Sequence, residues 1–337
     1  MEIVQVATSP EAMLNGVAVS PSGRVFSSFP RWTDKPTPGV AEAMPDGSFR
    51  PFPGGDWNEW RPGLPTRDRF VAIHSVHADR DNNLWVIDDS APRHAALADA
   101  RPKIVRIDLA RNAVARVYSL DVDVAPPGAV LGHMRVRGRH AYVTESHFGA
   151  LIILDLETGA ARRRLSRDAK TRADQTVVPV IDGQEFRRTD GSMQVINVNL
   201  LELSNDGEWL YFMALFGPML RRIATRHLLD AALDAAAISP HIEDVARVPP
   251  CAGIAIDRRG TLYFSSFTEN AIAMIGGDSA RRILVSDPRI AFPNEGSVGP
   301  DDFLYFPASQ ANRIPMFQPD GVSRVQAPWE VLKVRLA

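Results

Sequence analysis

Two acid–base side chains lie two residues apart in the stretch TESHFGA, which contains Glu145 and His147. Alternate residues of a β-strand face the same side, so this spacing places a carboxylate beside an imidazole if one strand runs through both. A neighbouring carboxylate holds one tautomer of a histidine and raises its basicity. The pair therefore suits general acid–base catalysis on an enolisable compound or a lactone.

A second set of polar residues stands at the start of five segments that are otherwise apolar. These residues are Asn15, His74, His133, Asn199 and Glu295. The two histidines and Glu295 would form a two-histidine, one-carboxylate set, which suits a transition metal. The same residues could instead act on a bound molecule without a metal, or only satisfy backbone groups around a water-filled channel.

Three further residues extend this candidate site. Asn294 precedes Glu295 and is a candidate for binding substrate. Trp32 would wall a pocket for an aromatic ligand, or else pack beneath a long loop. His77 follows His74 by three residues, so we expect it to be an additional base that faces the opposite side of the strand.

Other residues that could do chemistry have simpler explanations. Asp88 and Asp89, in the stretch VIDDSAP, are more typical of a turn than of a ligand set. Cys251 is the only cysteine, which excludes a disulfide within the chain and any multi-cysteine metal site. No charged residue flanks it, and inert burial is expected. The sequence motifs of serine hydrolases, nucleotide-binding loops and zinc proteases are absent.

The candidate residues belong to a pattern that occurs six times. Each copy has an alternating apolar stretch, a turn with Asp, Asn, Gly or Arg, and then an apolar and aromatic stretch, which together predict a β-hairpin. The six copies begin at Asn15, His74, Gly132, Asn199, Ala252 and Glu295. A hairpin unit that recurs about every 50 residues predicts a six-bladed β-propeller with four-stranded blades, and we take residues 1–337 as one such domain.

Segments outside the hairpins fit the same fold. Residues 103–120 and 150–159 are predicted to be outer strands of their blades. The strand-like ends EIVQVA and WEVLKVRL could share one blade and close the ring. Residues 223–238 have helical spacing and predict one short helix between blades. Residues 30–66, with eight prolines, and residues 166–193 are predicted to be long loops.

Composition excludes several classes of partner. Of the 337 residues 45% are hydrophobic, and the formal net charge of −2 gives no electrostatic reason to expect nucleic acid or an anionic membrane. No apolar run reaches the roughly 18–20 residues that span a bilayer. The start, MEIVQVATSP, lacks the features of a signal peptide, so we expect a cytoplasmic protein, or a periplasmic or secreted one if the chain is a trimmed form. We expect a small-molecule ligand and a monomer or small homo-oligomer.

Several ungapped segments, in the same order, resemble the major royal jelly protein/Yellow family in a compact, bacterial-looking version. GVAVSPSGRVFSSFPRW (16–32) is similar to the first blade of the family, and LGHMRVRGRHAYVTESHFGALIILDLETG (131–159) is similar to its third. Residues 190–215 resemble the fourth blade, and residues 249–272 and 292–314 resemble the last two. The resemblance implies the propeller fold. Family members include dopachrome-converting enzymes and ligand-binding secreted proteins.

The family is related in architecture to the gluconolactonase/regucalcin propellers, which are lactone hydrolases that depend on calcium or zinc. By resemblance, the metal ligands of those enzymes are a Glu, two Asn residues and an Asp. Asn199 matches one ligand Asn, whereas Asn15 stands at the Glu position, His74 at the second Asn position and Ala252 at the Asp position. Asn15, Asn199 and Glu295 remain as candidate ligands for calcium or zinc, but they offer one negative charge to a cation that prefers several.

Three functions follow. The first in rank is lactonase-like hydrolysis of a cyclic metabolite in a central pocket, with water activated by a metal or a histidine. The second is a metal-free isomerase or tautomerase that acts on an aromatic, dopachrome-like metabolite, in which Glu145, His147 and His133 move protons. The third is ligand binding without catalysis.

Overall fold

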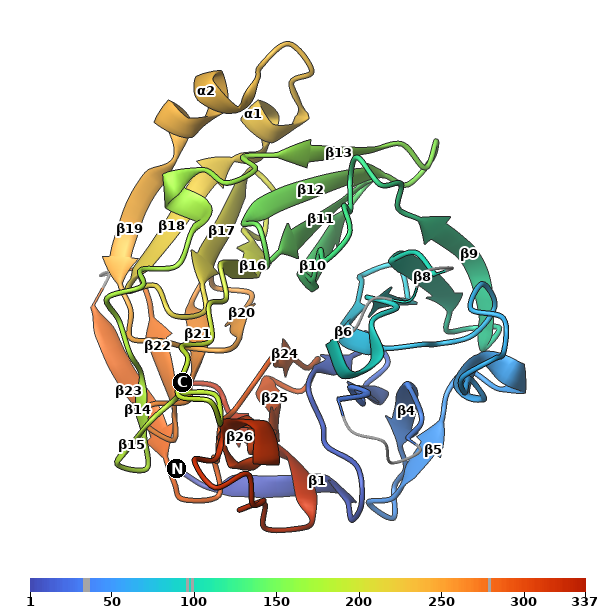
Figure 1. Cartoon of the computed structure of the whole chain (residues 1–337), viewed down its shortest axis with the longest axis vertical. Coiled ribbons are helices and arrows are strands. Elements are labelled where there is room, and N and C mark those ends of the chain that lie inside the picture. The colour runs from blue at the N-terminus through green and yellow to red at the C-terminus, as the bar shows by residue number, and fades with distance from the viewer. Residues whose placement is uncertain (33–36, 95–96, 98–99, 278–279) are drawn as a thin grey trace.

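Six antiparallel sheets stand around a central axis as the blades of a β-propeller (Figure 1). The computed structural model describes residues 1–32, 37–94, 97, 100–277 and 280–337. Each blade has four strands, and the first strand of each blade lies next to the axis. The predicted fold is therefore confirmed.

The first three blades follow one another in the chain. Blade 1 contains β2 (Val17–Val19), β3 (Val25–Ser28), β4 (Val40–Ala43) and β5 (Phe49–Pro51). Blade 2 contains β6 (Ile73–Ala78), β7 (Asn83–Asp88), β8 (Lys103–Asp108) and β9 (Ala113–Ser119). Blade 3 contains β10 (Leu131–Arg137), β11 (His140–Glu145), β12 (Ala150–Asp155) and β13 (Ala161–Arg164).

The remaining blades complete the ring. Blade 4 contains β16 (Val198–Leu203), β17 (Trp209–Ala214), β18 (Met219–Ala224) and β19 (Glu243–Arg247). Blade 5 contains β20 (Ile254–Ile256), β21 (Leu262–Ser266), β22 (Ala271–Ile275) and β23 (Arg281–Ser286). Blade 6 contains β24 (Ser297–Val298), β25 (Phe303–Ala308), β26 (Trp329–Arg335) and β1 (Ile3–Ser9).

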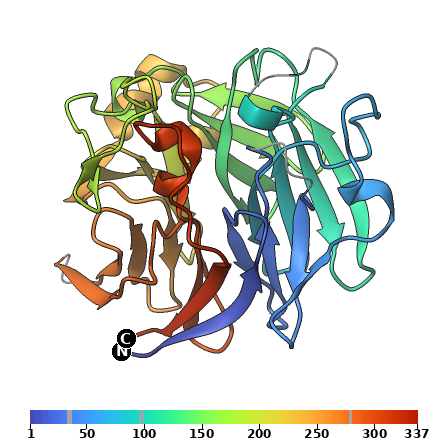
Figure 2. The ribbon, with the colours of Figure 1, turned by 60° about the horizontal axis from the view of Figure 1, so that its bottom comes forward.

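Both ends of the described chain contribute to blade 6, as expected from their strand-like sequences. β1 pairs antiparallel with β26, from Ile3 opposite Val334 to Ser9 opposite Trp329. The two termini consequently lie side by side at one end of the molecule, and the segment that connects β25 to β26 lies at the other (Figure 2). The ring is closed by backbone hydrogen bonds between the first and last strands.

Apolar side chains fill the spaces between the blades, which explains why many strands are apolar on both faces. In β12, five of the six residues are buried. Trp85 of blade 2 packs in one cluster with Leu131 and Ile152 of blade 3. A strand with neighbours on both faces loses the alternation of polar and apolar residues that marks a half-exposed strand. No helix among the described residues is both long enough and apolar enough to cross a membrane.

Three segments differ from their predicted form. Residues 30–66 are not one long loop, because they contain β4, β5 and the short helix η1 (Gly55–Asn58). Proline is tolerated in an edge strand such as β5, and the prolines concealed this strand in the sequence. Residues 166–193 contain η3 (Ala169–Thr171) and a small hairpin of β14 (Val180–Ile181) and β15 (Gln184–Glu185).

The helix-forming stretch at 223–238 forms two helices, α1 (Thr225–Leu229) and α2 (Ala235–Ile238). Asp234 begins the second helix, because its side chain accepts a hydrogen bond from the backbone N–H of Ala237 at 2.9 Å. Both helices lie between β18 and β19, within blade 4 rather than between two blades.

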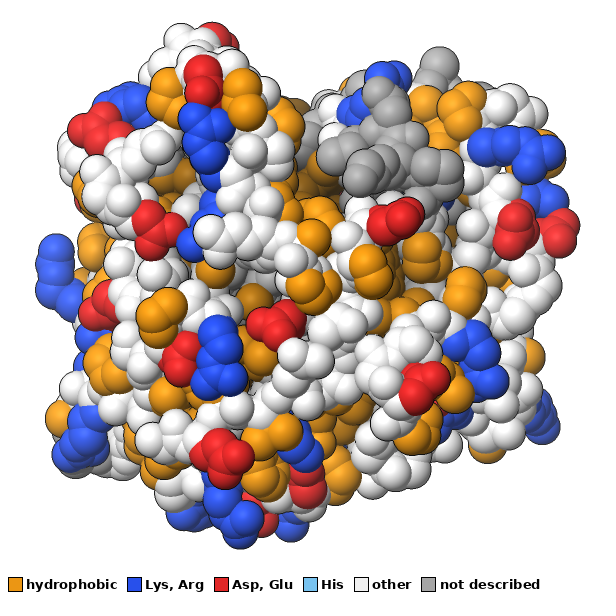
Figure 3. All heavy atoms as spheres, turned by 90° about the horizontal axis from the view of Figure 1, so that it is seen from below, with side chains coloured by type: hydrophobic (Ala, Val, Ile, Leu, Met, Phe, Trp, Pro, Cys, Tyr) orange, Lys and Arg blue, Asp and Glu red, His pale blue; other side chains and the backbone are white. Residues whose placement is uncertain are grey.

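The inner strand of each blade begins at one end of the propeller axis, which we call the upper end. The turns between the first and second strands of the blades lie at the other end, which we call the lower end. The outer surface over blades 1 and 6 mixes hydrophobic, basic and acidic side chains without a large area of one kind (Figure 3).

Candidate functional site

Three of the predicted site residues stand where the strand register is interrupted. The pairing of inner and second strands shifts at His74 in β6, at Gly132 and His133 in β10, and at Asn199 in β16. An irregularity of this kind leaves a residue outside the regular ladder and changes the direction of its side chain. Two of these residues, His74 and Asn199, line the cavity described below.

Hydroxyl groups of second strands fix the upper ends of neighbouring inner strands. Thr144 Oγ1 donates a hydrogen bond to the carbonyl oxygen of Asn199 at 2.6 Å, and Ser265 Oγ donates to that of Asn294 at 2.7 Å. Gly132 makes room for the first bond, because a Cβ there would lie 2.5 Å from Thr144 Oγ1 and 2.8 Å from the carbonyl oxygen of Asn199. These bonds set the positions of Asn199 and Asn294.

A cavity of about 130 Å³, which we call the upper pocket, opens at the upper end. Its polar lining consists of Asn15, His74, Ser146, His147, Gln194, Asn199 and Asn294. Aromatic and other apolar side chains form most of the remaining wall, chiefly Trp32, Phe186, Leu215, Phe292, Met316 and Phe317. Such a lining, apolar with a few convergent polar groups, is typical of small-molecule sites.

The amide of Asn15 is committed to holding blades together. Its Nδ2 donates to the carbonyl oxygen of His74 at 2.7 Å, and its Oδ1 accepts from Asn294 Nδ2 at 2.8 Å. Ser28 Oγ also donates to the His74 carbonyl, at 3.2 Å. Asn15 and Asn294 therefore join blades 1, 2 and 6, and they anchor the backbone of His74.

His74, which lines the upper pocket, forms a carboxylate–imidazole pair with Asp89. His74 Nδ1 lies 3.3 Å from Asp89 Oδ2, and Asp89 Oδ1 accepts from the backbone N–H of Leu131 at 2.7 Å. Burial raises the pKa of Asp89, while His74 and the Leu131 N–H act in the opposite direction. The carboxylate favours the tautomer with its proton on Nδ1, which leaves Nε2 as a base. The ring of Trp32 stands edge-on to His74 at 6.3 Å.

His133 and Glu295 lie beneath the upper pocket, and each is 1% exposed. His133 Nδ1 is 3.8 Å from Glu295 Oε1, and it has no hydrogen-bond partner among the described residues. Burial, together with the charge of Arg135, lowers the pKa of His133 well below 6.5. His133 is therefore a neutral imidazole in the interior.

Arg135 crosses the axis below these two residues. Its Nε donates to both carboxylate oxygens of Glu202 at 2.9 Å, and its Nη1 donates to Glu295 Oε1 at 3.0 Å. Ser75 Oγ donates to the other Glu295 oxygen at 2.5 Å. Although burial lowers the pKa of Arg135, the two carboxylates raise it above its usual value. The carboxylate of Glu295 is thus already paired with a cation.

The predicted pair of Glu145 and His147 does not form. Glu145 is fully buried, and its carboxylate makes an ion pair with Arg163 and accepts from the backbone N–H groups of His147 and Phe148, at 2.8 and 3.1 Å. Residue 147 follows the end of β11, so the side chains do not share a strand face. The prediction of a carboxylate beside the His147 ring was wrong, although His147 does line the upper pocket.

His77 lies at the opposite mouth from His74. It lines a cavity of about 360 Å³ at the lower end, together with Arg135, Glu202 and Glu295. Its separation from His74 follows from its position three residues further along β6, toward the lower end of the strand. The structure therefore removes His77 from the group of residues around the upper pocket.

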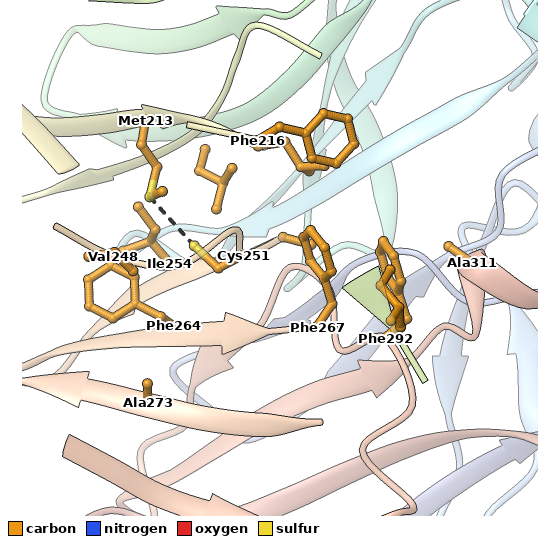
Figure 4. Close-up of a cluster of buried hydrophobic side chains, with 14 of the residues drawn as sticks. Met213, Phe216, Val248, Cys251, Ile254, Phe264, Phe267, Ala273, Phe292 and Ala311 are labelled. Atoms are coloured by element: carbon orange, nitrogen blue, oxygen red, sulfur yellow. Dashed lines mark hydrogen bonds between the residues drawn. The ribbon is translucent and has the colours of Figure 1, made fainter. Parts of the chain in front are cut away.

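Ala252 and Cys251 belong to a buried apolar cluster, where the Cys251 thiol contacts Met213 Sδ at 3.5 Å (Figure 4). Burial raises the pKa of the Cys251 thiol, which fits an inert side chain. The apolar position of Ala252 leaves no oxygen where the related lactone hydrolases, by resemblance, supply an Asp.

The candidate metal ligands do not fit a calcium or zinc ion. Asn15 is bonded within the protein, and Glu295 is bonded to Arg135, whose positive charge opposes a second cation. In the described part of the chain, no three His, Cys, Asp or Glu side chains converge as a metal site, and this includes His74, His133 and Glu295. Of the three candidate ligands Asn15, Asn199 and Glu295, Asn199 lines the pocket with no side-chain hydrogen bond among the described residues.

Three residues that matter for the site were not among those predicted from sequence: Asp89, Arg135 and Glu202. The sequence feature that marks these residues is a charged side chain within an apolar strand or directly after one. Arg135 lies two residues after His133 in GHMRVRG, and Glu202 lies in NLLELS. A buried charge needs a partner, so two opposite charges in inner strands indicate an ion pair on the axis.

The neutral state of His133 predicts a pH dependence of stability. Burial and Arg135 lower the folded-state pKa well below 6.5, so below about pH 6.5 the unfolded chain binds a proton that the folded chain does not. Stability should fall as the pH drops, by up to about 1.4 kcal/mol per pH unit for this residue. Urea unfolding between pH 7.5 and 5 should show a smaller loss for His133→Asn than for wild type.

His147→Asn, which removes an exposed histidine instead of a buried one, is the matched control. Burial raises the pKa values of Glu202 and Glu295, which changes the wild-type slope in the opposite sense. The difference between wild type and variant is therefore the informative quantity. Equal slopes for wild type and His133→Asn would show that His133 is charged or exposed in the folded protein.

Comparison with known proteins assigns the chain to a family. The sequence model of the major royal jelly protein family matches residues 71–279, which is more than half of the chain. The chain belongs to the major royal jelly protein family. The search of curated proteins found no match.

Several solved structures share the fold of this major royal jelly family chain. A streptogramin B lyase is 14% identical with a TM-score of 0.57, over 98% of this chain and 96% of the lyase. A gluconolactonase from Xanthomonas campestris is 13% identical with a TM-score of 0.59, over 100% of this chain and 89% of the gluconolactonase. The third structure is a catalytically inactive virginiamycin B lyase from Staphylococcus aureus, solved with quinupristin. It is 14% identical with a TM-score of 0.56, over 100% of this chain and 99% of the lyase. At these identities the likeness concerns the fold alone.

Proposed function

We propose that the upper pocket is the active site of an enzyme that moves a proton within a small aromatic or largely apolar metabolite, as an isomerase or tautomerase does. The observation that carries this proposal is the His74–Asp89 pair, 3.3 Å apart, with His74 in the wall of a cavity whose other walls are mainly aromatic and apolar. A base held by a carboxylate inside such a cavity suits proton abstraction next to a carbonyl or an imine.

The described residues suggest a role for each part of the pocket. His74 Nε2 accepts the proton, and Asp89 stabilises the resulting imidazolium. Asn199 is placed to donate a hydrogen bond to the oxygen that becomes negative. Trp32 and Phe292 provide flat surfaces for an aromatic ring. The proton then returns to another atom of the same molecule, so the reaction needs no oxidant, reductant or second substrate.

Two further considerations support proton transfer over metal-dependent lactone hydrolysis, which ranked first from the sequence. Glu295 is paired with Arg135, and Ala252 supplies no ligand, so the donor set does not suit a metal. The resemblance noted above also includes dopachrome-converting enzymes, whose substrate is aromatic. The His74–Asp89 pair could also activate water, and lactone hydrolysis without a metal is therefore the second candidate.

A substrate panel tests the proposal. The purified chain is incubated with aminochromes, followed by loss of their visible absorbance, and with aldono- and aryl-lactones, followed by acid release, each with and without EDTA. We expect turnover of at least one aromatic substrate above the buffer rate, with no effect of EDTA. Hydrolysis of lactones alone would favour the second candidate, and EDTA-sensitive hydrolysis would return the metal lactonase to first place.

A further inference from the structure

Five oxygen atoms from four blades converge on one guanidinium at the propeller axis. Besides both oxygens of Glu202 and one of Glu295, Arg135 contacts two backbone carbonyl oxygens: Nη1 donates to that of Met134 at 2.7 Å, and Nη2 to that of Ile254 at 3.0 Å. Arg135 itself comes from blade 3, and its partners in blades 4, 5 and 6 surround it. Its side chain is 7% exposed.

This set of acceptors has the composition of a hard-cation site. Calcium takes six to eight oxygen ligands, which can be carboxylates and backbone carbonyls. Here two carboxylates and two carbonyl groups surround the three nitrogens of one guanidinium, and Ser75 Oγ, bonded to Glu295, lies next to them. The two carboxylates carry a charge of −2 and the guanidinium +1, so the cluster keeps one excess negative charge. The inner strands are thus arranged around a positive charge.

The lower cavity gives this position a path to solvent. Arg135, Glu202 and Glu295 all line the cavity of about 360 Å³ at the lower end. An ion could therefore reach the carboxylates from below without passing through the upper pocket.

We propose that Arg135 is a built-in cation that occupies a latent divalent-cation site on the axis. In the wild-type chain the guanidinium holds the position and the charge that a calcium ion would otherwise take. Removal of the side chain at Arg135 leaves Glu202, Glu295 and the two carbonyl groups around an empty position, which then binds Ca²⁺. The guanidinium and Ca²⁺ thus exclude one another at one place.

Thermal unfolding of Arg135→Ala with and without Ca²⁺ tests this proposal. In EDTA the variant should unfold at a lower temperature than wild type, because two buried carboxylates lose their partner. With 1 mM CaCl₂ its Tm should rise by about 5 °C or more, whereas the wild-type Tm should change by less than about 1 °C. The double variant Arg135→Ala/Glu202→Gln should lose most of the calcium response. Arg137→Ala is the matched control, because Arg137 is exposed two residues further along β10 and should give no response.

A second measurement applies if Arg135→Ala does not fold in EDTA. The urea-unfolded variant is diluted into EDTA, into CaCl₂, or into a few millimolar guanidinium chloride, and the recovered far-UV circular dichroism is compared. Recovery with Ca²⁺ and with guanidinium supports the proposal. The proposal is overturned if Ca²⁺ stabilises the wild type, or if the variant folds but its Tm does not change with Ca²⁺. It is also overturned if neither Ca²⁺ nor guanidinium restores folding of the variant.

Discussion

Replacement of His74 by asparagine is expected to lower kcat/KM for the aromatic substrate by about 10²–10³-fold, because a positioned general base contributes an acceleration of this order. His74 lines the upper pocket with Nδ1 3.3 Å from Asp89, so loss of the imidazole removes the proton acceptor and leaves the surrounding walls. Steady-state kinetics on whichever substrate the panel identifies would measure the effect. The loss should appear in kcat rather than in KM.

Two companion variants make the His74 result specific. Asp89→Asn keeps the shape but loses the charge that stabilises the imidazolium, so its kcat should also fall by at least about tenfold. His77→Asn changes a histidine three residues further along the same strand, at the lower mouth, and should leave kcat unchanged. If His74→Asn and His77→Asn have equal activity, the upper pocket is not where the proton moves.

Glu145→Ala is expected to lower the free energy of unfolding by about 3–5 kcal/mol, the usual cost of breaking a buried ion pair. The change leaves the Arg163 guanidinium, 11% exposed, without its carboxylate. It also removes the acceptor of the backbone N–H groups of His147 and Phe148. Urea unfolding followed by circular dichroism would measure the loss.

A matched control for Glu145 lies on the same blade. Glu157 pairs with Arg139 at 2.8 Å, but the Glu157 side chain is 71% exposed, so Glu157→Ala should cost less than about 1 kcal/mol. Arg163→Met should destabilise about as much as Glu145→Ala, and the double variant should cost less than the sum of the two. A stable but inactive Glu145→Ala protein would instead show that Glu145 acts in catalysis.

The ring of blades was predictable because each blade repeats a local signal. A short apolar alternation, a turn and an aromatic stretch are enough to predict a hairpin, and six hairpins in order predict the propeller. The outer strands of blade 1 were not predictable, because β4 and β5 are short and lie among prolines. Edge strands carry less apolar pattern than inner strands, so their signal in sequence is weaker.

The candidate site was predictable by position but not by pairing. Asn15, His74 and Asn199 stand at the starts of inner strands, and the fold brings them to one mouth. The pairing of carboxylates with cations depends on how far the side chains reach across the axis. Arg135 and its partner Glu295, for example, are 160 residues apart in the sequence. Sequence spacing alone favoured Glu145 with His147, whereas the fold pairs Glu145 with Arg163 and His74 with Asp89.

Blade 6 is complete only when β1 and β26, which lie far apart in the sequence, have paired with each other. During synthesis β1 emerges before the strands of blade 1 but has no partner strand in its own sheet until β26, some 320 residues later, leaves the ribosome. Until then the incomplete propeller has two unpaired strand edges. Each of these edges can pair with a strand of another chain. A shortened copy that lacks residues 1–9 would keep one such border for its whole lifetime, and aggregation rather than loss of chemistry would be its characteristic defect.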